Sequence, residues 1–424
     1  MNKIGLLLLI FGPLMAISQP FKNVQIDIGS SFGGPEEPAI AISLKNPDII
    51  MAGANIKTTY LSKDGGLTWS RKEMTSRYGV YGDPCIISTS KGKFMYFHLS
   101  LPHGRPYEDD SFLDRIVCQT TKKNVKKFKK ASYMGLNSPK DQDKEWAVYD
   151  VERGRTYVSW TQFDTYGSKK PKDKSVILGS FSDDDGKTWS NPVTLSSVSG
   201  DCIDDDATTE GAVPAVGLNG EMYVAWALNE KIYFTTYVPG QDIPIEKEIA
   251  NQKGGWVQNI EGLNRTNGMP VTVSDLSDSP HRGAIYVCWS DQRNGELNTD
   301  IFITKSIDKG KTWSQAMRVN NDAGSNHQFL PWMTIDQTTG YLYLVFYDRR
   351  NYDNAQTDVY LAVSKDGGAT FENIKISESP FTPSERVFFG DYNNISAHQG
   401  VVRPIWTRYE NGKLSIWTAI IDDF

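Results

Sequence analysis

The chain reads Ser62-Lys63-Asp64-Gly65-Gly66-Leu67-Thr68-Trp69, and this pattern of serine, aspartate, glycine, threonine and an aromatic residue occurs four times. The other three copies are Ser182–Trp189, Ser306–Trp313 and Ser364–Phe371. In each copy the serine and aspartate oxygens can accept hydrogen bonds from turn amides, the glycine can adopt positive φ, and the aromatic ring can pack between strands. The pattern therefore predicts a tight hairpin that recurs along the chain.

The spacing of these hairpins indicates a repeat. Successive aromatic residues of the motif are separated by 120, 124 and 58 positions. A unit of about sixty residues explains these intervals if two copies have degenerated. We place the degenerate copies at Thr121–Phe128 and near Tyr237–Ile243.

A second register of short strands runs in parallel with the hairpins. Each strand alternates in polarity and ends on an aromatic residue, as a half-buried strand does. The copies are Tyr157–Trp160, Tyr223–Trp226, Tyr286–Trp289, Tyr343–Phe346 and the strand that ends at Trp406. In the stretch Phe94–His98 the aromatic position is held by His98.

Together the two registers predict seven units. Their expected starts lie near Glu37, Asp83, Glu145, Gly211, Gly268, Phe329 and Asp391. The seventh unit has only three strands, and Val24–Ile28 can supply the fourth, which would close the ring and remove exposed sheet edges. We therefore predict an all-β protein: a single seven-bladed β-propeller of four-stranded antiparallel blades over residues 19–424, closed by an N-terminal strand.

The hairpin motif resembles the Asp box, also called the BNR repeat, of the sialidase-like propeller superfamily, and the likeness covers nearly all of the expected mature chain. Sialidases of this superfamily usually have six blades and an Arg-Ile-Pro element before the first box. Here the corresponding stretch, Gly33–Pro38, has no arginine. These differences count against a sialidase, although Arg293, Arg349 and Arg408 could form the arginine triad of that family.

Seven-bladed Asp-box propellers of secreted bacterial proteins look more like the propeller-type ulvan lyases and the related ulvan oligosaccharide dehydratase. That resemblance implies β-elimination on a uronic acid, with histidine and tyrosine transferring protons and a cation neutralising the carboxylate. Asp boxes specify fold rather than chemistry, because they lie on the hairpin between the third and fourth strands. The ligand is expected on the opposite face, around the mouth of the channel.

Residues 1–18 read as a secretory signal peptide, with Lys3, an apolar run and the small-residue site Ala16-Ile17-Ser18. We expect a soluble monomer that is periplasmic or secreted and has no lipid anchor. The net charge of −6 gives no indication of a nucleic-acid or membrane partner. The four cysteines lack metal-ligand spacing, and no cofactor is expected, although Asp201–Asp206 could hold a structural Ca²⁺ or be a solvated acidic loop.

Candidate functional residues gather in loops predicted on the mouth face. His98 and His103 are candidate bases for proton abstraction, and Tyr166 is a candidate proton donor. We expect Arg293, Arg349, Arg408 and His327 to bind an acidic sugar. Loops leading into the first strands add Glu36, Asp83, Asp143, Glu210 and Asp391.

Each of these assignments has a structural alternative. His98 could fill an aromatic slot in the core between blades, and Tyr166 could be an exposed aromatic residue. Arg293 and Arg349 could pair with the nearby Asp291 and Asp348. The basic run at positions 122–130 is interpreted as a solvated strand edge that discourages pairing.

The leading hypothesis from sequence is a carbon–oxygen lyase that acts on a uronic-acid polysaccharide or oligosaccharide of the ulvan type. One alternative is an exo-acting glycoside hydrolase of sialidase type, for which a tyrosine nucleophile is known. The other alternative is a glycan-binding propeller without catalytic activity.

Overall fold

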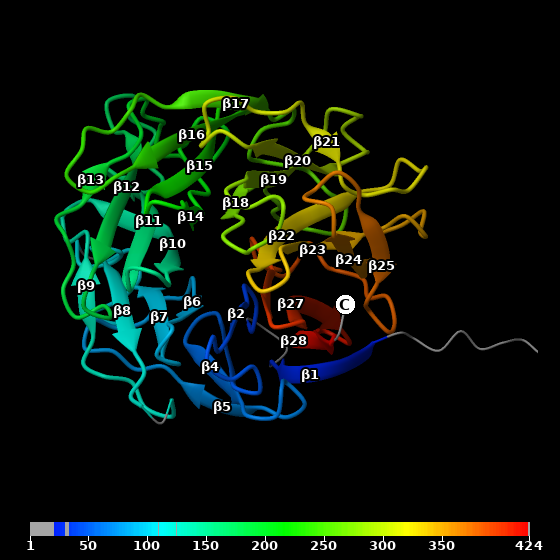
Figure 1. Ribbon diagram of the computed structural model, residues 1–424, viewed down its shortest axis with the longest axis horizontal. Helices are drawn as coiled ribbons and strands as arrows, with labels where there is room; N and C mark the ends of the chain where they lie inside the picture. Colours follow the sequence, from blue (N-terminus) through cyan, green and yellow to red (C-terminus); the bar gives the residue numbers. More distant parts are fainter. Residues whose placement is uncertain (1–20, 30–33, 109, 124, 423–424) are drawn as a thin grey trace, which may run out of the picture.

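The computed structural model describes residues 21–422 except 30–33, 109 and 124. The described residues form 28 strands in seven four-stranded antiparallel sheets and no helix. The sheets are arranged as blades around a central channel, so the seven-bladed β-propeller is confirmed (Figure 1). None of the described residues forms a helix that could span a membrane. The expected signal peptide lies outside the described residues.

In every blade the strands follow each other outward from the channel, and six blades are continuous in sequence. Blades 1 and 2 contain β2 (Ala39–Ile42), β3 (Ile50–Ala54), β4 (Thr58–Ser62), β5 (Ser70–Glu73), β6 (Cys85–Ser88), β7 (Phe94–Leu99), β8 (Ile116–Thr120) and β9 (Ser132–Met134). Blades 3 and 4 contain β10 (Asp141–Asp150), β11 (Arg155–Phe163), β12 (Ser175–Ser182), β13 (Val193–Thr194), β14 (Pro214–Val216), β15 (Met222–Leu228), β16 (Lys231–Tyr237) and β17 (Lys247–Asn251). Blades 5 and 6 contain β18 (Val271–Ser274), β19 (Ile285–Asp291), β20 (Asp300–Ser306), β21 (Met317–Arg318), β22 (Gln328–Asp336), β23 (Tyr341–Asp348), β24 (Asp358–Ser364) and β25 (Glu372–Lys375).

Blade 7 joins the two ends of the chain. It contains β26 (Asn394–His398), β27 (Val401–Glu410), β28 (Lys413–Ile420) and, as its outer strand, β1 (Lys22–Ile28). β1 runs antiparallel to β28, with Lys22 opposite Ile420, and Figure 1 shows the first and last strands side by side. The predicted closure by the N-terminal strand is therefore confirmed.

Side chains of β1 also tie blade 7 to the blades on either side. Asp27 accepts hydrogen bonds from Tyr60 Oη at 2.6 Å and from Arg71 Nε at 3.0 Å, and both donors belong to blade 1. The Asn23 side-chain amide donates to the carbonyl of Ile376, next to blade 6, at 2.8 Å. The closing strand thus connects three blades.

The repeated motif forms the hairpins expected from its residues. Ser62 Oγ accepts a hydrogen bond from the Gly66 amide at 2.9 Å, and Asp64 Oδ1 accepts one from the Thr68 amide at 2.9 Å. The other three copies have the same arrangement of hydrogen bonds. The degenerate copy Thr121–Phe128 is also a hairpin, closed by a bridge between its end residues. The local chemistry of the motif therefore explains where the third and fourth strands of a blade are joined.

The core lies between neighbouring blades. It is filled by the aromatic residues of the second strands, which are fully buried, namely Trp160, Trp226, Trp289, Phe346 and Trp406. All four cysteines are buried free thiols.

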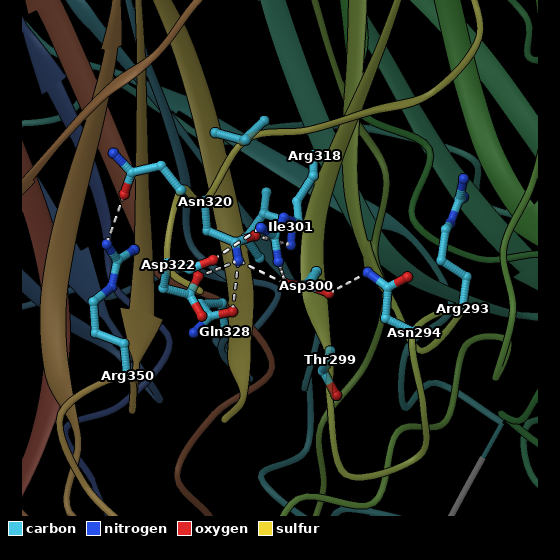
Figure 2. A network of polar contacts seen from close by, with 12 residues as sticks. Arg293, Asn294, Thr299, Asp300, Ile301, Arg318, Asn320, Asp322, Gln328 and Arg350 are labelled. Atoms are coloured by element: carbon cyan, nitrogen blue, oxygen red, sulfur yellow. Dashed lines mark hydrogen bonds and ion pairs between the residues drawn. The ribbon is translucent and has the colours of Figure 1, made fainter. Parts of the chain in front are cut away.

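A buried polar network joins blades 5 and 6 (Figure 2). Asp300, at the start of β20, accepts hydrogen bonds from Asn320 and Asn294, both at 2.6 Å, one on each carboxylate oxygen. Arg318 lies 3.4 Å from the same carboxylate. Asn320 also donates to the side-chain carbonyl of Gln328, in the first strand of blade 6, at 2.7 Å. Both oxygens of this buried carboxylate are therefore bonded, as expected for a structural polar group.

Candidate functional site

A cavity of about 220 Å³ opens where the innermost strands of blades 1, 2, 3 and 7 begin, and we call it the mouth cavity. Its polar lining consists of Glu36, Glu37, Asn55, Tyr81, Asp83, Tyr107, Asp143, Lys144, Tyr166, Arg265 and Asp391. The Asp boxes lie at the other end of the blades, because they connect third strands to fourth strands. The cavity is therefore on the face where the sequence predicted the ligand.

Three charged residues that lead into first strands share an unusual backbone conformation. Glu37, Asp83 and Lys144 have φ values of 52°, 47° and 50°, in the left-handed region that non-glycine residues rarely adopt. They occupy corresponding places in blades 1, 2 and 3, before or within β2, β6 and β10. Backbone strain of this kind costs roughly 1–3 kcal/mol per residue and is concentrated at functional sites. Leu330, at the corresponding place in blade 6, has a φ of 49°, so the conformation belongs to the blade repeat, which places these three charged side chains around one cavity.

The centre of the cavity holds a network of ion pairs. Asp391 accepts hydrogen bonds from Lys144 Nζ at 2.8 Å and from Arg265 Nε at 2.8 Å. Arg265 also contacts Asp204 at 3.0 Å, and Tyr166 Oη donates to the same carboxylate at 2.7 Å. Both cations of the cavity are therefore already paired with carboxylates.

This network keeps Asp391 ionised. Burial by itself would raise the pKa of the Asp391 carboxyl, but the charges of Lys144 and Arg265 outweigh burial and lower the pKa to about 2. Lys144 is itself almost fully buried, and its own pKa lies well above the usual range because the effect of Asp391 and other carboxylates exceeds that of burial. At neutral pH the two groups form a buried salt bridge.

Glu36 lies in the same cavity, and its pKa is shifted in the opposite direction to that of Asp391. Its side chain is 6% exposed, and its Oε2 atom has no hydrogen-bond partner among the described residues. Burial, reinforced by the negative charge of Asp83, raises the pKa of Glu36 to about 7. A carboxylic acid that keeps its proton near neutral pH can act as a general acid.

Further carboxyl groups are buried around the cavity without donors. Neither carboxyl oxygen of Glu145 or of Glu210 has a hydrogen-bond partner among the described residues. Burial, followed by nearby carboxylates, raises the pKa of both groups well above the usual value. The pKa of Glu37 and of Asp143 is raised for the same reasons. The raised pKa values favour the neutral form of these groups, which limits the negative charge of the cavity.

The described residues contain no group of three or more His, Cys, Asp or Glu side chains placed to hold a metal ion. In the acidic loop, Asp201 Oδ1 accepts a hydrogen bond from Thr208 Oγ1 at 2.7 Å, and Asp206 Oδ1 accepts one from the Val257 amide at 2.8 Å. Asp204 of the same loop belongs to the ion-pair network. These carboxylates are therefore engaged in local hydrogen bonds.

Of the residues proposed from sequence for catalysis, Tyr166 lies in the mouth cavity. Burial, followed by the charges of Asp143 and Asp204, raises the pKa of the Tyr166 phenol above its usual value. The phenol thus stays protonated and is a hydrogen-bond donor rather than a nucleophile.

The two histidines lie elsewhere. His98 is 0% exposed, its Nδ1 lies 2.8 Å from the carbonyl of Leu99, and burial lowers its pKa to about 4. It therefore fills the aromatic slot of blade 2 in the core, as the structural alternative proposed, and cannot reach a substrate. His103 is exposed in the loop after β7 and does not line the cavity.

The residues proposed for substrate binding do not meet in one place. Arg293 pairs with Asp291 and lies over the ring of Phe302 at 4.0 Å, and in Figure 2 it extends away from the Asp300 network. Arg349 and His327 line a separate small cavity of about 230 Å³. Burial and the charge of Arg349 lower the pKa of His327 to about 4.

Arg408 bonds to Ser379 at 2.7 Å and lies over the rings of Phe381 and Trp417. The arginine triad expected of a sialidase is therefore not assembled from these three arginines. The physical reason is that each guanidinium is already bound by nearby carboxylate, carbonyl or hydroxyl groups or packed on an aromatic ring.

Several residues of the cavity were not proposed from sequence. Glu37 and Lys144 lie beside residues that were placed on the mouth face, so the position of the strand starts could have identified them. Arg265 comes from the connection between β17 and β18, which has no repeat pattern, and no signal in the sequence pointed to it.

No protein-family model and no curated protein sequence matches this chain. Among solved structures, NanB sialidase from Streptococcus pneumoniae is 8% identical, with 88% of this chain and 83% of that chain covered and a TM-score of 0.50. An α-L-arabinanase from Penicillium chrysogenum complexed with arabinobiose is 14% identical, with 81% and 97% covered and a TM-score of 0.50. A protein of unknown function from Dyadobacter fermentans is 11% identical, with 95% and 98% covered and a TM-score of 0.50. At these identities the likeness shows the propeller fold alone, and the relation to ulvan lyases stays a prediction.

Proposed function

We propose that the protein is a glycoside hydrolase that cleaves a glycosidic bond in the mouth cavity. The observation that carries the proposal is the contrast between two carboxyl groups of one cavity, Glu36 with a pKa of about 7 and Asp391 with a pKa of about 2. Glycoside hydrolysis usually needs one carboxylic acid and one carboxylate, and opposite shifts of two neighbouring groups assign the two roles.

In this mechanism Glu36 donates its proton to the oxygen of the departing sugar. Asp391 stays ionised and stabilises the positive charge that develops on the sugar ring in the transition state. A water molecule then forms the new bond to the anomeric carbon and returns a proton to the Glu36 carboxylate, so the acid is restored. Lys144 and Arg265 hold Asp391 in place and keep its charge through the contacts described above. Tyr166 donates a hydrogen bond to Asp204, which also contacts Arg265, and so helps to fix the position of Arg265.

The charges of the cavity favour a neutral sugar at the point of cleavage. A sialic acid or a uronate would need an unpaired cation, whereas Lys144 and Arg265 both face carboxylates. The volume of about 220 Å³ is smaller than that of typical ligand pockets, which favours one terminal sugar unit over a long segment of polymer.

The uronate lyase inferred from sequence is the second candidate. It is favoured by Tyr166, which lies in the cavity as a protonated phenol and was the proton donor of that hypothesis. It lacks a histidine base there, because His98 is buried in the core and His103 does not line the cavity.

The two candidates differ in their products. The protein would be incubated with a panel of 4-nitrophenyl glycosides of neutral sugars, with a sialoside, and with ulvan oligosaccharides. Release of nitrophenol from a neutral glycoside supports the hydrolase, whereas growth of the ultraviolet absorbance of an unsaturated uronate supports the lyase.

A single substitution then tests the role of Glu36. Glu36→Gln is expected to lower kcat by about 10²–10⁴-fold on 4-nitrophenyl glycosides, because the leaving oxygen loses its proton donor. The loss is expected to be much smaller on 2,4-dinitrophenyl glycosides, whose leaving group needs no proton. The matched control is Glu296→Gln, a change at an exposed position in another blade. Equal activity of the Glu36→Gln variant and the wild type on both substrates would reject the assignment.

A further inference from the structure

Two grooves flank the hairpin of residues 121–130 in blade 2. Groove 1, of about 430 Å³, lies between blades 1 and 2 and is lined by Lys63, Lys72, Lys126, Trp69 and Phe128 among others. Groove 2, of about 420 Å³, lies between blades 2 and 3. Its lining includes Arg77, Lys129, Lys130, Lys187, Tyr78 and Tyr133.

The grooves carry concentrated positive charge in a chain whose net charge is −6. The stretch Lys122-Lys-Asn-Val-Lys-Lys-Phe-Lys-Lys130 has six lysines and no acidic residue. The described residues that line groove 1 include no carboxylate. In groove 2 the one lining carboxylate, Asp185, is already paired with Lys91 at 2.9 Å and Lys93 at 2.8 Å.

The tertiary structure adds cations from neighbouring blades to this hairpin. Lys72 of blade 1 donates to the carbonyl of Lys126 at 3.2 Å, which brings the two blades together along groove 1. In groove 2, burial and the nearby charge of Lys93 lower the pKa of Lys129. The charge of Asp185 acts in the opposite direction without cancelling this shift, so an anion bound in the groove would relieve the remaining crowding of like charges.

Aromatic rings stand among these cations. Trp69 and Phe128 are half-buried and present part of their surface to groove 1. Tyr78 and Tyr133 meet at a centroid distance of 5.2 Å in groove 2, and the guanidinium of Arg115 lies 4.9 Å from each ring. Rings of this kind offer apolar surface to the flat face of a sugar, and ammonium groups pair with its carboxylates or sulfates.

We propose that the two grooves form a binding site for an acidic polysaccharide, one strand of which crosses the lysine-rich hairpin. The grooves share no lining residue with the mouth cavity, so binding and cleavage occupy separate sites. The choice of a polysaccharide over other polyanions rests on the proposed glycoside hydrolase function. In this arrangement the grooves hold a charged polymer. The mouth cavity cleaves a neutral sugar unit that is attached to this polymer.

The test is affinity electrophoresis in gels containing polygalacturonate or neutral dextran. The wild type is expected to be retarded by polygalacturonate and not by dextran, with retardation falling as salt is added. Replacing Lys63, Lys72 and Lys126 together by Glu is expected to weaken binding at least tenfold. The matched control replaces Lys22, Lys311 and Lys413, which are exposed and outside both grooves, by Glu. Equal binding by the two triple variants would overturn the proposal.

The aromatic contribution needs a separate variant. Phe128→Leu preserves apolar packing but removes the ring, and it is expected to weaken binding of polygalacturonate severalfold while leaving binding of polyphosphate unchanged. Unchanged binding of both polymers would mean that charge alone acts and would overturn the sugar assignment. Tighter binding of a single-stranded oligonucleotide or of phosphatidylglycerol vesicles than of polygalacturonate would also overturn it.

This site and the proposed function can fail separately. Glu36→Gln is expected to bind polygalacturonate as tightly as the wild type. If no glycoside is cleaved but the groove variants lose binding, the hydrolase proposal falls and the binding site stands.

Discussion

The Asp300 network between blades 5 and 6 and the mouth cavity are both built from buried carboxyl groups, yet they differ in how these groups are satisfied. Both oxygens of Asp300 accept hydrogen bonds from asparagine side chains. At the mouth, Glu36 has one oxygen without a partner, and Glu145 and Glu210 have none bonded. A satisfied buried carboxylate stabilises the fold, whereas an unsatisfied one costs stability and is retained where its protonation state is needed.

The largest effect on stability is expected at the buried ion pair of the mouth cavity, Asp391 and Lys144. Asp391→Asn leaves the Lys144 ammonium buried without its anion and is expected to lower the free energy of unfolding by about 3–5 kcal/mol. The double variant Asp391→Asn with Lys144→Met is expected to recover most of this loss but to stay inactive. Urea unfolding and a glycoside assay measure both quantities.

The control for this prediction is the exposed pair of Lys231 and Glu248, which are 41% and 42% exposed. Glu248→Gln is expected to change the free energy of unfolding by less than about 1 kcal/mol. An Asp391→Asn variant as stable as the wild type would show that Lys144 is not held by this carboxylate.

A somewhat smaller loss is expected in the structural network. Asp300→Ala removes the acceptor of the Asn294 amide and one of the acceptors of the Asn320 amide. It is expected to lower the free energy of unfolding by about 3 kcal/mol. Activity per folded molecule should not change, because the network does not touch the mouth cavity. Asp278→Ala, at a fully exposed side chain, is the control. If Asp300→Ala lost activity but kept its stability, the Asp300 network would not be purely structural, and the distinction between it and the mouth cavity would be wrong.

The dependence on pH is the most gradual of these effects. Because Glu36 must be protonated, kcat/KM is expected to fall tenfold for each pH unit above about 7. The raised pKa also means that the folded state holds this proton more tightly than the unfolded state does. The stability contributed by protonated Glu36 is therefore complete below pH 4.5 and is lost as pH rises through about 7. Urea unfolding of Glu36→Gln should lack this decline, and an identical pH profile would contradict the assigned pKa.

Much of the fold could be predicted from the chain because each blade is encoded by local signals. The Asp-box hairpins and the aromatic second strands recur at a regular interval, and the predicted blade starts lie within four residues of the first strands. The face that holds the site followed from strand direction, and Glu36, Asp83, Asp143, Glu210 and Asp391 were placed on it. The histidines and arginines were predicted from their chemistry alone. Most of them make structural contacts with neighbouring side chains, carbonyls or rings.

What the sequence determined by itself was the number, order and closure of the blades, because hairpin chemistry and alternation of polarity act over a few neighbouring residues. Only the tertiary structure decided which carboxyl group is protonated and which is ionised. Arg265 and Asp391 are 126 positions apart, and Lys144 and Asp391 are 247 apart. Their pKa values depend on burial and on charges that meet only when the ring is closed, and no local pattern carries that information.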